Sequence, residues 1–402
     1  MLKSGFSLLA AAVLTSGVAL AFTKKDAGVG SIETIHQVNA ANAQAQHGDV
    51  DGAIAILTRA LDAPDMDTKS LAVIRYDRGM DYLTKRDFVQ AIDDFTAATE
   101  ENPHYHAAYV ALASAWYASG NTEKCIAELQ HAIAVDPANA DAHANLANVY
   151  HGEGRDDDAV AEYDRSIETE PSAYAYEGGG LIQLSKGHVN KAIADLTAAL
   201  RLKPDYFDAF VNRGMAYANL GDGQSAIADL NAALAMRPND INVRIDRGNV
   251  YALLGQSDLA IAEFSTAITS RPDDPVLRRS RGDAYLALQN YPKALADYDA
   301  TLRLLPNDAA TLFNRGAVLY AMGRYSDAVT NDRAAIRLYP RDARLYDNLG
   351  TAYGAQGKLD EAIAAYDAAL RIEPENRQAN RDRAGALRAR ETGQKIVVDT
   401  RE

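Results

Sequence analysis

Residues 205–238 read DYFDAFVNRGMAYANLGDGQSAIADLNAALAMRP and contain two helical patterns separated by a glycine. Apolar and small residues recur at helical spacing in both halves, at Phe210, Gly214 and Tyr217 and then at Ala226, Leu230 and Ala233. Gly221 follows the first pattern, where a helix end favours a left-handed residue, and Pro238 stops the second. The stretch therefore predicts two helices joined by a tight turn.

The same unit recurs along the chain with an almost constant period. The prolines that close successive units are Pro103, Pro137, Pro171, Pro204, Pro238, Pro272, Pro306, Pro340 and Pro374. Neighbouring members of this series are 34 residues apart, except for one step of 33 between Pro171 and Pro204. A period of this length indicates stacked helical units, because a single unit cannot bury its own apolar face.

The last complete unit carries a full set of repeat marks: Tyr346, Gly350, Tyr353, Gly357, Ala362, Tyr366, Ala369 and Pro374. In these marks the chain resembles the tetratricopeptide repeat (TPR) family, although Arg75, Arg244 and Arg278 take the early large position of their units. A degenerate first unit keeps Gly48, Ala53, Leu57 and Ala60. We expect an all-α solenoid of about ten helix-turn-helix repeats and a C-terminal capping helix. The resemblance implies a right-handed superhelix whose inner groove is lined by the first helices.

The chain termini have a different composition from the repeats. Residues 1–21 read as a signal peptide, with an apolar run after Lys3 and an A-x-A pattern at Ala19-Leu20-Ala21. An uncleaved anchor over residues 5–22 is the alternative, and only then would we expect membrane attachment. Residues 22–33 are a predicted linker, 34–391 the solenoid and 392–402 a tail. We therefore expect an exported protein, in the periplasm of a Gram-negative bacterium.

Composition and motifs argue against several classes of function. The formal charge of −14 disfavours nucleic acid as a partner. Metalloprotease, nucleophile-elbow and P-loop motifs are absent from the sequence. We therefore expect a protein that is not an enzyme and has neither a cofactor nor a metal site. Cys125 takes a place that is Ala in the other clear units, which predicts a small core residue. The acidic run Glu153, Asp156, Asp157 and Asp158 indicates a solvated helix cap rather than a cation loop.

Five first helices carry an Arg-Gly pair, at Arg78, Arg213, Arg247, Arg281 and Arg315. One interpretation is a ladder of cations for an anionic ligand. The other pairs each arginine with the residue sixteen positions later, which is an acid in four units and Asn331 in the fifth. We favour the internal pairing, because a buried arginine needs a partner.

By family resemblance, certain places on the first helices face the inner groove. The candidate peptide-binding residues at these places are Tyr76, Met80, Tyr117, Asn145, Asn148, Tyr174, Asn212, Met215, Asn249, Phe313, Tyr320 and Asn348. Asn145, Asn212, Asn314 and Asn348 share the sixth place of their units, where some relatives hydrogen-bond a peptide backbone. An equally good alternative is that these asparagines satisfy polar groups of neighbouring helices.

These features predict a non-catalytic scaffold that binds a peptide or partner helix of another protein in the groove, in cell-envelope assembly or export. One alternative is a structural subunit of an envelope polysaccharide or secretion machine, which binds folded partners on its outer face. Another is a carbohydrate-binding or regulatory domain that uses the groove tyrosines.

The stretch Gly178-Gly179-Gly180 interrupts the helical composition of the fifth unit. Counting from Gly187 places Gly180 at the usual glycine of the first helix, and no phosphate-binding motif follows. Two extra glycines cost roughly 1 kcal/mol each relative to alanine and remove two side chains from the packing. We therefore expect a soft joint near residues 172–181, with residues 174–184 less protected from hydrogen exchange than 208–219.

Overall fold

The computed structural model describes residues 32–63 and 66–393, and within them it contains 21 helices and no strand. The predicted signal peptide, nearly all of the linker and the C-terminal tail lie outside the described residues, as does the alternative anchor over residues 5–22. None of the described helices is both long and apolar enough to cross a membrane.

The chain divides into two compact units, Met1–Ala209 and Phe210–Glu402, and the division falls in the first turn of α12. The helices before the division are α2 (Ile32–Gln46), α3 (Val50–Leu61), α4 (Thr68–Thr84), α5 (Phe88–Glu101), α6 (His106–Ala118), α7 (Thr122–Val135), α8 (Ala140–Gly152), α9 (Asp156–Thr169), α10 (Ala173–Ser185) and α11 (Val189–Leu202). From the division onward they are α12 (Phe207–Leu220), α13 (Gly223–Met236), α14 (Ile241–Leu253), α15 (Ser257–Ser270), α16 (Pro275–Ala287), α17 (Tyr291–Leu304), α18 (Ala309–Ala321), α19 (Tyr325–Leu338), α20 (Ala343–Ala355), α21 (Leu359–Ile372) and α22 (Arg377–Thr392).

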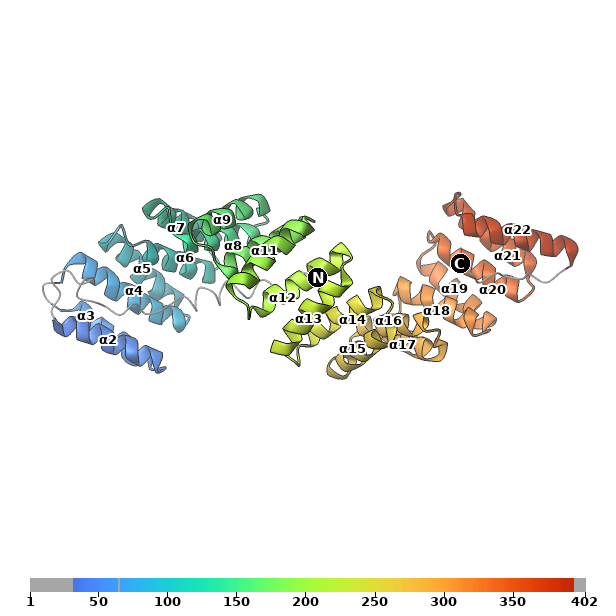
Figure 1. The fold of residues 1–402 in the computed structure, drawn as a ribbon, viewed down its shortest axis with the longest axis horizontal. Coiled ribbons are helices and arrows are strands. Elements are labelled where there is room, and N and C mark those ends of the chain that lie inside the picture. Colours follow the sequence, from blue (N-terminus) through green and yellow to red (C-terminus); the bar gives the residue numbers. More distant parts are fainter. Residues whose placement is uncertain (1–31, 64–65, 394–402) are drawn as a thin grey trace. The chain divides into compact units, whose positions relative to one another are not determined.

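The helices form ten consecutive pairs, each an even-numbered helix followed by an odd-numbered one, and α22 follows the last pair. Within each unit the second helix of a pair also packs against the first helix of the next, so the pairs stack in chain order (Figure 1). The predicted ten repeats and terminal helix are therefore confirmed, with α2 beginning at Ile32 and α22 ending at Thr392.

Every pair turns through a residue with a left-handed backbone between its two helices. Gly221 has a φ of 87°, and seven other pairs also place a glycine there: Gly48, Gly120, Gly154, Gly187, Gly255, Gly323 and Gly357. The remaining two pairs use Arg86 and Gln289, with φ of 59° and 56°. A side chain in this conformation is strained, so these two turns are less favourable than the glycine turns.

One place on the second helix fills the space between successive pairs, and we call it the bridging position. Its residues are Leu57, Phe95, Leu129, Tyr163, Leu196, Leu230, Phe264, Tyr298, Asp332 and Tyr366, and each is at most 2% exposed. The ring lies against a glycine of its own first helix: a Cβ added to Gly350 would lie 2.6 Å from Cε1 of Tyr366. It also reaches the next pair, since Phe264 shares an apolar cluster with Leu277 and Ala284.

The triple glycine lies in the middle of α10, and its backbone is an uninterrupted helix. Gly180 approaches Leu196 as predicted for the usual glycine, with an added Cβ at 3.1 Å from Cγ. The expectation that Gly178 leaves a gap in the packing was wrong. A Cβ at Gly178 would lie 2.8 Å from Cε1 of Tyr163 and still closer to its hydroxyl end, so the ring of the preceding pair takes that space. The soft joint lies inside the first unit and stays a prediction.

Candidate functional site

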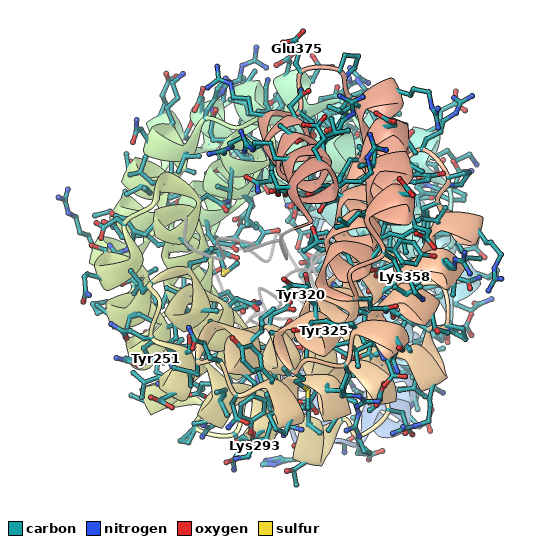
Figure 2. All side chains as sticks on the ribbon, turned by 90° about the vertical axis from the view of Figure 1, so that its right-hand side faces the viewer. Tyr251, Lys293, Tyr320, Tyr325, Lys358 and Glu375 are labelled. Carbon is teal, nitrogen blue, oxygen red and sulfur yellow. The ribbon has the colours of Figure 1, made fainter. Side chains whose placement is uncertain are left out.

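All twelve predicted binding residues lie on even-numbered helices. We call the side of each unit formed by these helices its A face. Six of the residues belong to the first unit and six to the second, and all are half-buried except Asn249, which is exposed. Figure 2 shows Tyr320 of α18 toward the inner edge of the second unit's helices and Lys293 of α17 at their outer edge.

In the first unit, hydrogen bonds connect Asn148 to two tyrosines from neighbouring helices. The Tyr163 hydroxyl donates to Asn148 Oδ1 at 2.6 Å, and Asn148 Nδ2 donates to the Tyr174 hydroxyl at 2.5 Å. Burial raises the pKa of Tyr174 to about 12, so this hydroxyl stays protonated. Asn148 also donates to the carbonyl of Ala144, so its polar atoms already serve the fold. The structure brings the predicted residues Asn148 and Tyr174 together, chiefly as packing.

The other first-unit candidates are also partly used in packing. Tyr76 lies against Phe95 and Tyr105, with ring centroids 5.9 and 5.2 Å apart, and burial raises its pKa to about 12. Met80 packs on the same apolar cluster as Tyr76. Tyr117 packs on the cluster that Tyr174 also touches, and Asn145 lies half-buried on α8.

In the second unit, the candidates on α18 and α20 are half-buried, like those of the first unit. The guanidinium of Arg344 lies over the Phe313 ring, 5.1 Å from its centroid, and the Tyr320 ring lies 5.4 Å from that of Tyr325 (Figure 2). Asn348 Nδ2 is buried and has no hydrogen-bond partner in the described part of the chain. Asn212, Met215 and Asn249 lie on α12 and α14, at least two helix pairs before this group.

The sixth-place asparagines divide between the two interpretations. Asn314 Nδ2 donates to Asp283 Oδ1 at 2.8 Å, so this residue satisfies a neighbouring helix. Asn348 has an amide nitrogen that no group of the described chain uses. Asn348 therefore does not satisfy a neighbouring helix through this nitrogen.

Carboxylates on the even-numbered helices are a feature that the sequence interpretation missed. Burial raises the pKa of Asp77 to about 7 and those of Asp246 and Asp347 to about 6, and partial desolvation raises the pKa of Asp283, whose side chain still reaches the surface. Asp347 Oδ1 is buried and unpartnered within the described residues. In the sequence, acids recur at the fifth, sixth and ninth places of the first helices, and this recurrence could have identified these carboxylates.

The Arg-Gly arginines are paired inside the fold, as predicted. Arg281 donates from Nε and one terminal nitrogen to the two oxygens of Asp297, both at 2.8 Å, and Arg78 and Arg213 make the same two-pronged pairs with Asp94 and Asp229. Arg247 pairs with Glu263. In the fifth repeat with an Arg-Gly pair, Arg315 instead donates to Asp299 at 2.7 Å and also to Asn331. These charges are therefore neutralised by neighbours and form no ladder of unpaired cations.

The remaining chemical candidates have structural roles. Cys125 is 2% exposed and burial raises its pKa to about 12, which fits the predicted core residue. Asp156, Asp157 and Asp158 form the first turn of α9, and each pairs with a basic side chain: His151, Lys186 and Arg155, respectively. The described residues contain no group of three or more His, Cys, Asp or Glu that could hold a metal ion.

Family models for tetratricopeptide repeats match most of the chain. They cover residues 76–124, 113–154, 142–172, 179–241, 241–274, 282–323 and 308–375. The chain belongs to the tetratricopeptide repeat family. No curated protein matches it.

Solved TPR structures resemble the chain at low sequence identity. The APC/C hetero-tetramer Cut9-Hcn1 is 16% identical over 88% of this chain and 83% of the other, with a TM-score of 0.45. Yeast Tom70 is 15% identical over 90% and 96%, with a TM-score of 0.39. YrrB, described as a TPR protein with an unusual peptide-binding site, is 26% identical over 46% and 95%, with a TM-score of 0.43.

Proposed function

We propose that this TPR protein is a non-catalytic scaffold that binds an extended peptide or a partner helix on the A face of its second unit. TPR repeats support protein–protein interaction, and this chain has ten of them. The observation that carries the proposal is the surface formed by Phe313, Tyr320 and Asn348. Two aromatic side chains there accompany an amide nitrogen without a partner in the described chain, which suits a segment that buries apolar side chains and offers main-chain carbonyls.

Selection of binding peptides from a displayed library tests this proposal. A Phe313→Ala/Tyr320→Ala/Asn348→Ala variant should lose the selected peptides. A change of Leu304, which is 43% exposed on α17, to Ala should retain them. The variant leaves Tyr117 and Asn148, which pack within the first unit, unchanged. Peptides that bind the triple variant and the wild type equally would refute binding at this surface.

Binding of folded partners through the opposite side is a second candidate, supported by one row of exposed apolar residues. Met236, Leu304 and Leu338 end the second helices of three repeats in the second unit and are 39%, 43% and 44% exposed. Their recurrence at the same helix end makes them candidate contacts for a folded partner. A partner that is captured by wild type and lost on Leu304→Ser/Leu338→Ser, but kept by the A-face variant, would establish this second function.

We also propose that the protein is exported, on the strength of the predicted leader over residues 1–21. Fractionation of cells that make the full chain tests this: processed protein should appear in the periplasmic fraction. Protein of unprocessed mass in the cytoplasm would contradict export, and membrane-bound unprocessed protein would indicate the anchor.

A further inference from the structure

The ninth repeat differs from the other nine at the bridging position. The other repeats carry Leu, Phe or Tyr there, and this one carries Asp332, which is only 1% exposed. Asp332 Oδ1 accepts a hydrogen bond from Asn331 at 2.9 Å, but its Oδ2 is buried without a partner among the described residues. A buried carboxylate oxygen without a donor costs stability. A costly exception to a local rule is expected where a protein binds something.

The preceding repeat shows which groups the side chain at the bridging position contacts. The Tyr298 hydroxyl donates to Asp283 Oδ1 at 2.7 Å, and Asn314 of the next repeat donates to the same oxygen at 2.8 Å. Asp283 is exposed on α16. The space filled by the Tyr298 ring therefore runs from the interior, beside Gly282, to the surface of the A face.

One repeat later, the asparagine of this arrangement remains, but the tyrosine ring and the surface carboxylate that accepts from it are absent. The residues 34 positions after Asp283, Tyr298 and Asn314 are Ala317, Asp332 and Asn348. Ala317 offers no acceptor and Asp332 has no ring, so neither supplies the contacts made in the preceding repeat. Both Asp332 Oδ2 and Asn348 Nδ2 are then left buried and unpartnered within the described chain.

Two arginines on α18 and α19 are engaged by other groups. Arg315 on α18 binds Asp299 at 2.7 Å and Asn331 at 3.1 Å, and Arg333 on α19 lies over the Tyr353 ring. On α20, Asp347 adds a carboxylate close to Asn348 in sequence, and its Oδ1 is also unpartnered in the described residues. The local surplus is negative, so a cationic group must come from outside this set.

We propose that Asp332, Ala317 and Asn348 form a site for an arginine side chain of a peptide partner, inserted from the A face between α18 and α20. The guanidinium is planar, as is the ring at this place in other repeats, and its N–H groups satisfy the carboxylate by charge-assisted hydrogen bonds. The peptide main chain supplies the carbonyl that accepts from Asn348 Nδ2. This site rests on the proposed A-face function and specifies one residue of its partner.

The test compares two tripeptides, acetyl-Ala-Arg-Ala-amide and its citrulline counterpart, which has the same shape without the charge. Calorimetric titration is carried out at pH 8, because burial raises the pKa of Asp332 to about 7 and its carboxyl group is ionised above that pH. The arginine peptide should bind the full chain at least tenfold more tightly than the citrulline peptide. Equal affinities would overturn the proposal, as would displacement of the arginine peptide by Mg²⁺ or Ca²⁺, which would assign the site to a metal ion.

Two variants separate binding from folding. Asp332→Leu copies the residue that four other repeats carry and should raise Tm while abolishing arginine binding. Ala317→Met keeps Asp332 and covers the opening, as Met215 does at the same place of its repeat, and should also abolish binding. Ser114→Met, at the same place on α6, is the matched control and should leave binding unchanged. Undiminished binding by Asp332→Leu would overturn the site.

The outcomes also distinguish this inference from the broader function. Library peptides that require Phe313 and Tyr320 but contain no arginine would uphold the A-face scaffold and refute the arginine site. Arginine binding that survives Phe313→Ala/Tyr320→Ala would uphold the Asp332 site and refute those aromatic residues as the scaffold surface.

Discussion

Replacing Gly178 by alanine should destabilise the protein, although alanine is the better helix former. The added methyl would lie 2.8 Å from Cε1 of Tyr163 and closer to the hydroxyl end of a ring that is only 2% exposed. Overpacking of this kind costs about 1–3 kcal/mol. Displacing the ring also breaks its hydrogen bond to Asn148, worth about 1 kcal/mol, while the helix preference returns about 1 kcal/mol. The expected net loss is therefore about 1–3 kcal/mol.

The next residue provides a matched control in the same helix. A Cβ at Gly179 would meet only the Cβ of Tyr163, at an ordinary 3.8 Å. Gly179→Ala should therefore stabilise the protein by up to about 1 kcal/mol, because only the helix preference changes. Urea unfolding followed by circular dichroism measures both variants, and hydrogen exchange at residues 173–185 localises the effect if the stack does not unfold in one step. A Gly178→Ala variant as stable as Gly179→Ala would refute the reasoning.

A second substitution isolates the ring as the cause. Tyr163→Leu installs the residue that other repeats use at the bridging position. In that background the methyl of Gly178→Ala no longer meets a hydroxyl-bearing ring, so its cost should disappear. Strict additivity of the two changes would show that the cost has another origin.

Three further predictions follow from backbone strain, charge pairing and burial. Gln289→Gly should raise the free energy of unfolding by about 0.5–1 kcal/mol, because relief of a left-handed residue exceeds the added entropy of the unfolded chain. A double-mutant cycle on Arg281 and Asp297 should give a coupling of about 1.5–3 kcal/mol, as expected for a two-pronged charged pair. Burial raises the pKa of Asp77 to about 7, well above about 3.9 in the unfolded chain. The contribution of this carboxyl group should therefore make the free energy of unfolding fall as pH rises from about 4 to about 7. Asp77→Asn should remove that part of the pH dependence, as measured by urea titrations at each pH.

Each of these has a control within the chain. Gly255→Gln, at a turn where an added Cβ meets nothing within 4 Å, should be destabilising through the backbone alone. The exposed pair of Arg390 and Asp360 should show no measurable coupling, and a coupling equal to that of Arg281 and Asp297 would contradict the role of burial. Asp222 is an exposed N-cap of α13 whose pKa is lowered by hydrogen bonds from Ser225, so Asp222→Asn should leave the slope between pH 5 and 7 unchanged.

The fold was predictable because its signal is local and repeated. The proline period and the apolar spacing around Gly221 specify helices and turns within one repeat, and the sixteen-residue offset of Arg281 and Asp297 is likewise a contact within a pair. Contacts between repeats were harder to predict from the sequence. That Tyr163 fills the space over Gly178 depends on how one pair docks on the next, which no local pattern encodes.

The candidate site was predictable only in outline. Family register placed Phe313, Tyr320 and Asn348 on one face, but it could not show that Asn148 is consumed by two tyrosines whereas Asn348 is left without a partner. Asp332 was visible in the 34-residue register as the one acid in an apolar series. Its significance depends on an unpaired oxygen, and this requires the structure.

The bridging position also affects how the array comes apart. In a linear array the total stability is a sum of terms for single repeats and for nearest-neighbour junctions. At the junction after α19 this position is Asp332 instead of an apolar side chain, so we expect its nearest-neighbour term to be lowered. Unfolding should then begin there, with α20, α21 and α22 separating as a block before the helices that precede them. A ligand that strengthens this junction would lengthen the cooperative segment by one and a half repeats.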